Sequence, residues 1–234
     1  MNTLKNQVEQ DPANAQGDIL SATLERRSFL KYAGAGAAGI ALIAAGCKKD
    51  KMDGRANFGR DDIAILNYAY ALEQLEAAFY TKVVASPYTG ISSLESSIMT
   101  DIRDHEIAHR EFFKAALGGS AIPSLEVDFS SVNFSSRDSV LSTAKAFEDL
   151  GVSAYNGAGF LIKSDAYLTL AGKIVSVEAR HAAMIRDLIS NGTFADSSVV
   201  NAQGLDTSRS PSQVLAIAGT YIKTPLNVEG LPTY

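Results

Sequence analysis

The chain has 234 residues, 46% of them hydrophobic, so it is long enough to bury the core of one domain and still leave a tail. Its formal net charge is −5 and its Lys and Arg residues are scattered, which excludes the basic surface that nucleic-acid binding needs. The single cysteine excludes an intrachain disulfide, a cysteine-rich zinc site and a four-cysteine iron site.

Residues 1–46 have the features of an export signal. A polar stretch over 1–25 is followed by Arg26-Arg27-Ser28-Phe29-Leu30-Lys31 and then by an apolar run, rich in Gly and Ala, over 32–46. That run is too short and too poor in large side chains for a transmembrane helix, so we expect a cleaved signal. The arginine pair and its neighbours resemble the twin-arginine signal of bacteria, which exports proteins that have already folded.

A lone cysteine directly follows this apolar run. The stretch Ile43-Ala44-Ala45-Gly46-Cys47 resembles the lipobox of bacterial lipoproteins, where the chain is cut before a cysteine that then carries a lipid. A plain cleaved signal and a buried thiol in a core helix are the alternatives. Lipidation explains the position of the cysteine better, and residues 47–59 would then form a charged tether. We therefore expect an exported protein of the periplasm or cell envelope, anchored through a lipid on Cys47.

Helical patterns dominate residues 60–192. The first segment contains no Gly or Pro, and its apolar residues recur at helical spacing. Ser92-Ser93-Leu94-Glu95 forms a capping box before the second segment, and Ser135 with Asp138 and Ser164 with Asp165 open the third and fourth. The connection over 118–136 has no helical period. The predicted long helices cover residues 63–84, 92–117, 135–157 and 164–191.

Residues 193–234 are expected to form a polar loop, one short helix and an extended tail. Ser210-Pro211-Ser212-Gln213 combines a cap, a proline in the first turn and a glutamine three residues after the cap, so it predicts a helix that ends near Ile222. The apolar residues that this helix is expected to bury are Val214, Leu215, Ile217, Ala218 and Tyr221.

Four long helices in two closely linked pairs predict an all-α fold. One long connection joins the pairs, so the architecture is a four-helix bundle with a crossover between its second and third helices, plus the short C-terminal helix.

Two stretches within these helices repeat the pattern Glu-x-x-His. They are Glu106-Ile107-Ala108-His109 on the second helix and Glu178-Ala179-Arg180-His181 on the fourth, in a chain with only three histidines. Positions i and i+3 of a helix share one face, so each stretch can direct an oxygen and a nitrogen ligand at one point.

The first and third helices also match each other. Each carries an apolar residue, a glutamate and a tyrosine at seven-residue spacing, so the glutamates Glu73 and Glu148 share their helix faces with similar neighbours. Glu76, one turn from Glu73, is the alternative ligand on the first helix, but the match with Glu148 favours Glu73. The two repeats are Leu66, Glu73, Tyr80 and Leu141, Glu148, Tyr155.

Four carboxylates that converge inside a bundle would be prohibitively costly if they were ionised and unpaired. Two divalent cations supply four positive charges and remove that cost. Carboxylate oxygens with one imidazole for each metal suit iron or manganese. The expected roles are metal bridging by Glu106 and Glu178, nitrogen ligation by His109 and His181, and terminal ligation by Glu73 and Glu148.

Other polar and aromatic residues near these positions have plainer expected roles. His105 is rotated by about 100° from Glu106 on the helix, so we expect it at the surface or beside a ligand. Tyr80 and Tyr155 are expected to pack in the core, with a hydrogen bond to the site as the alternative. Solvated faces or ligand contacts are expected for Asp104 and Arg180, and the core for Met99 and Met184.

This arrangement resembles the ferritin-like di-iron/di-manganese carboxylate superfamily. The stretches Leu72–Tyr80 and Val177–Ala183 are similar to the exported ferritin-like domain proteins of bacteria, and the resemblance covers about residues 60–222. It implies two Fe or Mn ions and an oxidoreductase of the ferroxidase, peroxidase or catalase type that acts on Fe²⁺, O2 or peroxide. A non-enzymatic, metal-binding or stress-related envelope scaffold is the alternative. The expected partners are metal ions, small oxidants and the membrane, and a homodimer is a candidate assembly.

Overall fold

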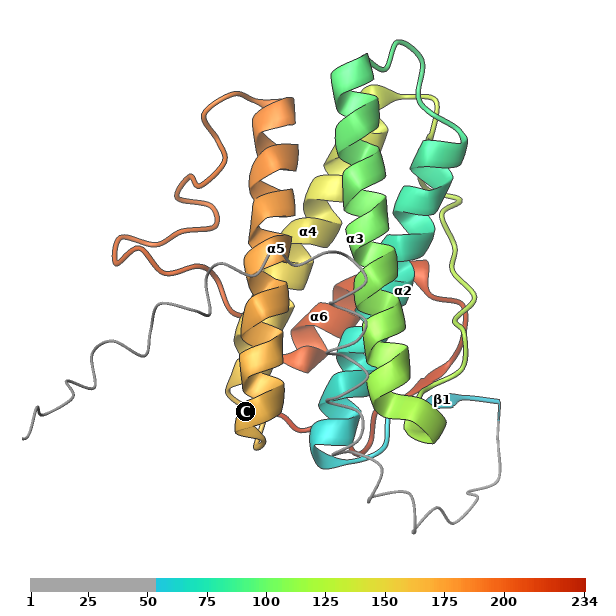
Figure 1. Ribbon diagram of the computed structural model, residues 1–234, viewed down its shortest axis with the longest axis vertical. Helices are drawn as coiled ribbons and strands as arrows, with labels where there is room; N and C mark the ends of the chain where they lie inside the picture. The colour runs from blue at the N-terminus through green and yellow to red at the C-terminus, as the bar shows by residue number, and fades with distance from the viewer. Residues whose placement is uncertain (1–53) are drawn as a thin grey trace, which may run out of the picture. The chain divides into compact units, whose positions relative to one another are not determined.

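The computed structural model describes residues 54–234, so the export signal expected over 1–46 and the lipidation expected at Cys47 lie outside the described residues. The all-α bundle with a crossover is confirmed (Figure 1). Across residues 54–234, no helix combines the length and the apolar character that crossing a membrane requires. The helices are α2 (Asp61–Ala85), α3 (Ser93–Leu117), α4 (Arg137–Gly159), α5 (Asp165–Ile189) and α6 (Pro211–Ala218).

Side-chain caps set most of the helix starts. Ser92 and Ser210 each form a complete capping box, with Glu95 and Gln213 respectively, as the sequence predicts. The cap of α4 is Ser136 rather than the expected Ser135, and its hydroxyl accepts a hydrogen bond from the backbone N–H of Ser139. Local hydrogen-bonding chemistry therefore fixes where these helices begin, to within one residue.

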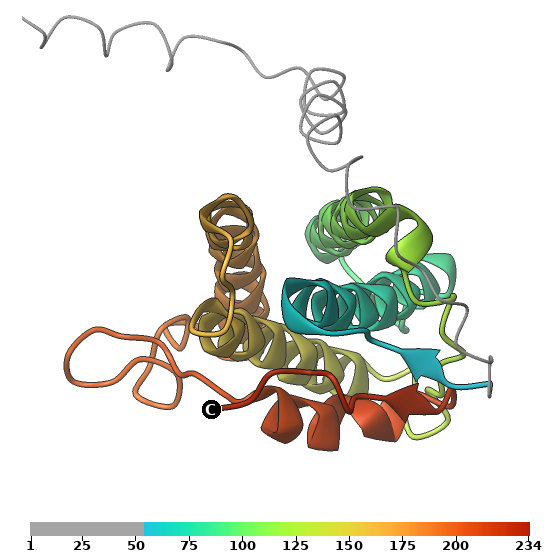
Figure 2. The same cartoon turned by 90° about the horizontal axis from the view of Figure 1, so that it is seen from below.

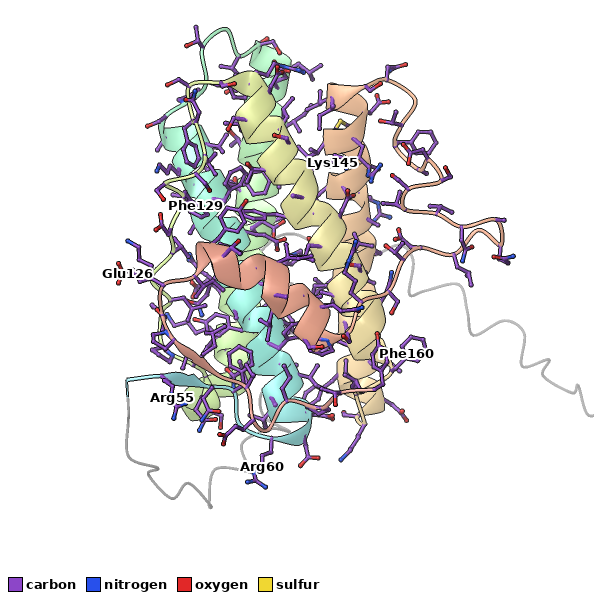
Figure 3. The ribbon with its side chains drawn as sticks, turned by 180° about the vertical axis from the view of Figure 1, so that it is seen from behind. Arg55, Arg60, Glu126, Phe129, Lys145 and Phe160 are labelled. Atoms are coloured by element: carbon purple, nitrogen blue, oxygen red, sulfur yellow. The ribbon has the colours of Figure 1, made fainter. Side chains whose placement is uncertain are left out.

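The helices of residues 54–234 lie in three layers. The antiparallel pairs α2–α3 and α4–α5 pack closely, and α2 meets α4 in the middle layer. Viewed from below, α3 and α5 lie on one side of that layer (Figure 2). Helix α6 crosses α2 and α4 on the opposite side, followed by the 3₁₀ turn η3 (Gly219–Tyr221) (Figure 3).

The central helix α2 is buried over nearly its whole circumference, because the crossover covers the side that the other helices leave open. The Asn67 side chain donates to the backbone carbonyls of Phe58 and Ser120, at 3.1 and 2.9 Å, and accepts from the Ile122 N–H at 2.8 Å. About two helical turns after Asn67, the Gln74 side chain accepts a hydrogen bond from the Leu125 N–H at 2.8 Å. Polar side chains of α2 thus hold the crossover, whose backbone would otherwise lack partners. Aromatic contacts complete this packing, and they join Phe79, Phe129, Phe134, Phe147 and Tyr221.

The chain ahead of α2 joins the core. Strand β1 (Ala56–Asn57) pairs in parallel with β2 (Leu226–Asn227) near the C-terminus. Ala56 and Phe58 are fully buried, although both lie within the tether expected over residues 47–59. A two-residue pairing is too short to give a periodic sequence signal, so only the structure reveals it.

Two expected core residues are exposed instead. Ile217 is 43% exposed, because the eight-residue helix α6 buries only the stripe that contains Val214 and Ala218. Met184 is 44% exposed on α5, whereas Met99 is buried as expected. Apolar character alone was therefore a poor guide on these two helices.

Close packing at Gly157 leads to a stability prediction. A Cβ on Gly157 would lie 1.9 Å from the Arg209 carbonyl oxygen, which is a backbone atom of the segment leading into α6. We expect Gly157→Ala to destabilise the fold by about 3 kcal/mol, because the backbone must shift to remove the clash. Thermal unfolding measures the effect. The matched control is Gly172→Ala on α5, where a Cβ meets nothing within 4 Å and a stabilisation of about 0.5–1 kcal/mol is expected. Equal unfolding midpoints for the two variants would contradict the packing argument.

Candidate metal centre

The structure brings all six predicted site residues together between the four long helices. The four glutamates are 0% exposed, and the histidines His109 and His181 are 9% and 5% exposed. Each long helix contributes one glutamate, and α3 and α5 each add a histidine one turn later. The six residues are Glu73, Glu106, His109, Glu148, Glu178 and His181.

One group of donor atoms surrounds His109. Its Nδ1 lies 2.9 Å from Glu178 Oε1, 3.4 Å from Glu73 Oε2 and 3.7 Å from Glu106 Oε2. These four residues offer ligand atoms that all lie within 4.8 Å of one another, which is close enough to hold one metal ion.

A second group repeats this geometry around His181. Its Nδ1 lies 2.9 Å from Glu106 Oε1, 3.5 Å from Glu148 Oε2 and 3.8 Å from Glu178 Oε2. The two groups share Glu106 and Glu178, and each shared carboxylate turns one oxygen to each group. Two metal ions side by side, bridged by these two carboxylates, match this arrangement.

The donor atoms of both groups lack hydrogen-bond partners. Eight buried oxygen and nitrogen atoms of the six residues have none, although His109 Nδ1 and His181 Nδ1 each lie 2.9 Å from a carboxylate oxygen. Buried polar atoms are normally satisfied, and a whole cluster left unpaired demands an explanation. Unpartnered oxygen and nitrogen atoms that converge in this way fit a cation, so the residues present suit metal ions.

Two buried tyrosines donate hydrogen bonds to Glu73 and Glu148, and each tyrosine lies on the opposite helix from its glutamate. Tyr80 on α2 donates to Glu148 Oε1 on α4 at 2.5 Å, and Tyr155 on α4 donates to Glu73 Oε1 on α2. Burial, followed by the adjacent carboxylate, raises the pKa of both phenols, so each remains a donor. The core packing expected for these residues is present, and the alternative of a hydrogen bond to the site is present as well.

The metal-free cluster shares protons between acids and histidines. Burial raises the pKa of Glu106 and of Glu148. Burial acts in the same direction on Glu178, but the adjacent histidines His109 and His181 outweigh it and lower the pKa of Glu178 to about 2. Burial would lower the pKa of both histidines, yet the surrounding carboxylates raise that of His181 to about 12 and that of His109 well above its ordinary value. Without metal, these directions favour an ionised Glu178 between two protonated histidines.

Glu76, the alternative ligand on α2, is buried beside the cluster but belongs to neither donor group. A Cβ on Gly151 would lie 3.2 Å from Glu76 Oε1, so the missing side chain at Gly151 leaves the space that this carboxyl group occupies. Burial and the neighbouring Glu106 raise the pKa of Glu76, which favours the neutral acid. Of the two glutamates, only Glu73 belongs to a donor group, and its role as a ligand stays a prediction.

Of the three remaining neighbours, His105 contacts a residue of the cluster, whereas Asp104 and Arg180 lie at the surface. His105 Nδ1 lies 2.9 Å from His181 Nε2, so this residue is exposed yet touches the site. Asp104 pairs with Arg103 at the surface, and Arg180 donates to the backbone of Ser176. Helical spacing places His105 near its neighbours on α3, but its contact with α5 depends on how the two helices are rotated and could not be found from sequence.

Comparison with known proteins agrees with this geometry. A family model described as a ferritin-like domain matches residues 61–191, which span all four long helices and all six clustered residues. No curated protein matches the chain.

Proposed function

The chain belongs to the ferritin-like domain family, and on that premise we propose that it is a dinuclear metal carboxylate protein of the cell envelope that acts as an oxidoreductase on Fe²⁺, O2 or peroxide. The observation that carries this proposal is the cluster of eight unpartnered donor atoms in two groups that share Glu106 and Glu178. Buried acids and imidazoles at this density are typical of functional sites.

The proposed ligands are the six clustered residues. Glu106 and Glu178 would serve both ions, His109 and His181 would each supply one nitrogen, and Glu73 and Glu148 would each supply one oxygen. The set consists of carboxylate oxygens with one imidazole for each ion and contains no thiolate, which favours iron or manganese.

In this proposal, the surrounding side chains position the ligands and exclude water from the centre. Bound ions would supply redox chemistry and Lewis acidity at the centre. Tyr80 and Tyr155 hold the terminal carboxylates in place by occupying one oxygen of each. Complete burial of the glutamates keeps bulk water away and limits substrates to small molecules such as O2, peroxide or a metal ion.

We also propose that the protein acts outside the cytoplasm. The twin-arginine-like stretch Arg26–Lys31 and the lipobox-like stretch ending at Cys47 support export and lipid anchoring. A route for folded proteins suits a domain whose metal ions are enclosed by four helices.

A non-enzymatic scaffold is the second candidate. The complete burial of the four glutamates favours it, because a closed centre can serve as a structural cross-link without turnover. In that case the ions would remain bound and no oxidant would be consumed.

Metal analysis and turnover assays distinguish the candidates. The protein, purified from a host that exports it, should contain two Fe or Mn ions per chain and should oxidise Fe²⁺ or consume peroxide. Stable metal without turnover would support the scaffold. Protein that is empty of metal, and that stays empty and equally stable after incubation with Fe²⁺ or Mn²⁺, would refute the metal centre in both candidates.

A single substitution tests the ligand assignment. His181→Ala should lose at least one ion per chain while the metal-free fold suffers only modestly, because it removes a nitrogen donor but little buried apolar surface. Elemental analysis and circular dichroism measure the two effects. Arg180→Ala, which changes an exposed neighbour on the same helix, is the matched control and should keep its metal. Unchanged metal stoichiometry in His181→Ala would show that this residue is not a ligand.

A further inference from the structure

The two halves of the centre differ at one position that touches a proposed ligand. His105 directly precedes Glu106 on α3, and the corresponding residue before Glu178 on α5 is Val177. We propose that His105 is a positioning residue that orients His181 and makes the two metal positions unequal, with the ion beside His181 bound more tightly. This inference rests on the proposed two-metal centre.

The contact between the two imidazoles has the geometry of a hydrogen bond. Nδ1 of His105 and Nε2 of His181 are 2.9 Å apart, the ring centroids are 5.1 Å apart, and the ring planes differ by only 8°. Because the facing nitrogens are much closer than the ring centres, the nearly coplanar rings meet edge to edge and not face to face. Ring N–H bonds and nitrogen lone pairs lie in the ring plane, so this geometry aligns a donor with an acceptor.

The direction of this hydrogen bond follows from the other face of His181. Its Nδ1 faces Glu106, Glu148 and Glu178, where the proposed ion would take the lone pair of that nitrogen. A neutral imidazole that ligates through Nδ1 carries its proton on Nε2, so His181 donates and His105 Nδ1 accepts. The bond holds the ring orientation of His181 before metal binds, and it selects the Nε2–H tautomer once the proton on Nδ1 gives way to the ion.

Such outer partners measurably affect metal binding. Loss of the group that accepts a hydrogen bond from a ligating histidine typically costs about 10–100-fold in metal affinity. The aliphatic Val177 offers no acceptor, so His109 lacks the imidazole partner that His181 has. Two otherwise matched donor groups should therefore fill in sequence, with the group around His181 first.

Titration of the metal-free protein with Mn²⁺, with free Mn²⁺ followed by electron paramagnetic resonance, tests the proposal. The wild type should show two binding steps of different affinity. His105→Val, which copies the residue of the other half, should weaken the tighter step by about 10–100-fold and leave the weaker one unchanged. Val177→His is the reciprocal variant, and it should strengthen the weaker step, because it places the same kind of acceptor before Glu178 that His105 provides before Glu106.

Rescue by a conservative variant separates positioning from packing. His105→Gln retains an acceptor oxygen and should keep most of the tight binding, and its Co²⁺-loaded form should have the visible absorption bands of the wild type. The bands of His105→Val should differ, because its His181 ring is no longer held. Wild-type Mn²⁺ binding in His105→Val, or equal weakening of both steps in the Val and Gln variants, would overturn the inference alone. Absence of Mn²⁺ and Co²⁺ binding in the wild type would refute the two-metal proposal and this inference with it.

Discussion

Removal of both metal ions is expected to lower the unfolding midpoint of the protein by about 15–30 °C. A ligand held at about 1,000 times its dissociation constant adds about 4 kcal/mol to the free energy of unfolding, and two ions add about twice that. In a domain of this size, 1 kcal/mol shifts the midpoint by about 2–4 °C. The reason for so large an effect is the cluster itself, because its fully buried glutamates lose the cations that balance them.

Calorimetry of loaded, chelated and reloaded protein measures this shift. Glu111→Gln serves as the control, because Glu111 is an exposed partner of Arg110 outside the cluster and its loss should leave the response to chelator intact. His181→Ala should respond less than the wild type, since it begins with fewer ions. A chelated wild type that melts at the temperature of the loaded protein would mean that the carboxylates need no cation.

The stability of the metal-free and metal-loaded proteins should change with pH in opposite directions. In the metal-free protein, the pKa of His181 rises from 6.5 to about 12 on folding, so its contribution is complete below pH 6.5 and is lost as the pH rises toward 12. The raised pKa values of Glu106 and Glu148 act in the same direction, above their ordinary value of 4.5. The lowered pKa of Glu178 contributes stability that is lost only as the pH falls toward 2. From about pH 6.5 to 9, His181 alone should remove about 3 kcal/mol.

Metal reverses the sign of this dependence. Bound ions require deprotonated ligands, so the loaded folded state holds fewer protons than the unfolded chain and gains stability as the pH rises toward neutrality. Unfolding in guanidinium chloride across this pH range, with and without chelator, should give two lines of opposite slope. Parallel lines would contradict the assignment of the histidines as proton carriers in the metal-free cluster.

Much of the fold follows from sequence because its determinants are local. Capping boxes at Ser92 and Ser210 and unbroken helical patterns place every helix, and the error at the start of α4 is a single residue. The pairing of β1 with β2 joins residues that are 170 positions apart, and neither this pairing nor the burial of Phe58 is encoded in a local pattern. The exposure of Ile217 likewise depends on which side of α6 meets α4.

The donor set follows from sequence for a different reason. The duplicated spacing matches Glu73 with Glu148 and each Glu-x-x-His with the other. A ligand assigned in one half can therefore be checked against the matching residue in the other half. The tyrosine contacts and the His105 contact join different helices, and they depend on helix rotation and depth. Residue types and spacings within one helix contain no information about either quantity.

The sharing of Glu106 and Glu178 between the donor groups has a consequence for assembly. Each group takes three residues from one helical hairpin and a single bridging carboxylate from the other hairpin. Neither hairpin can complete even one group alone, but any two complementary hairpins can complete both. If two copies exchanged hairpins through an opened crossover, the resulting domain-swapped dimer would therefore rebuild every donor group unchanged.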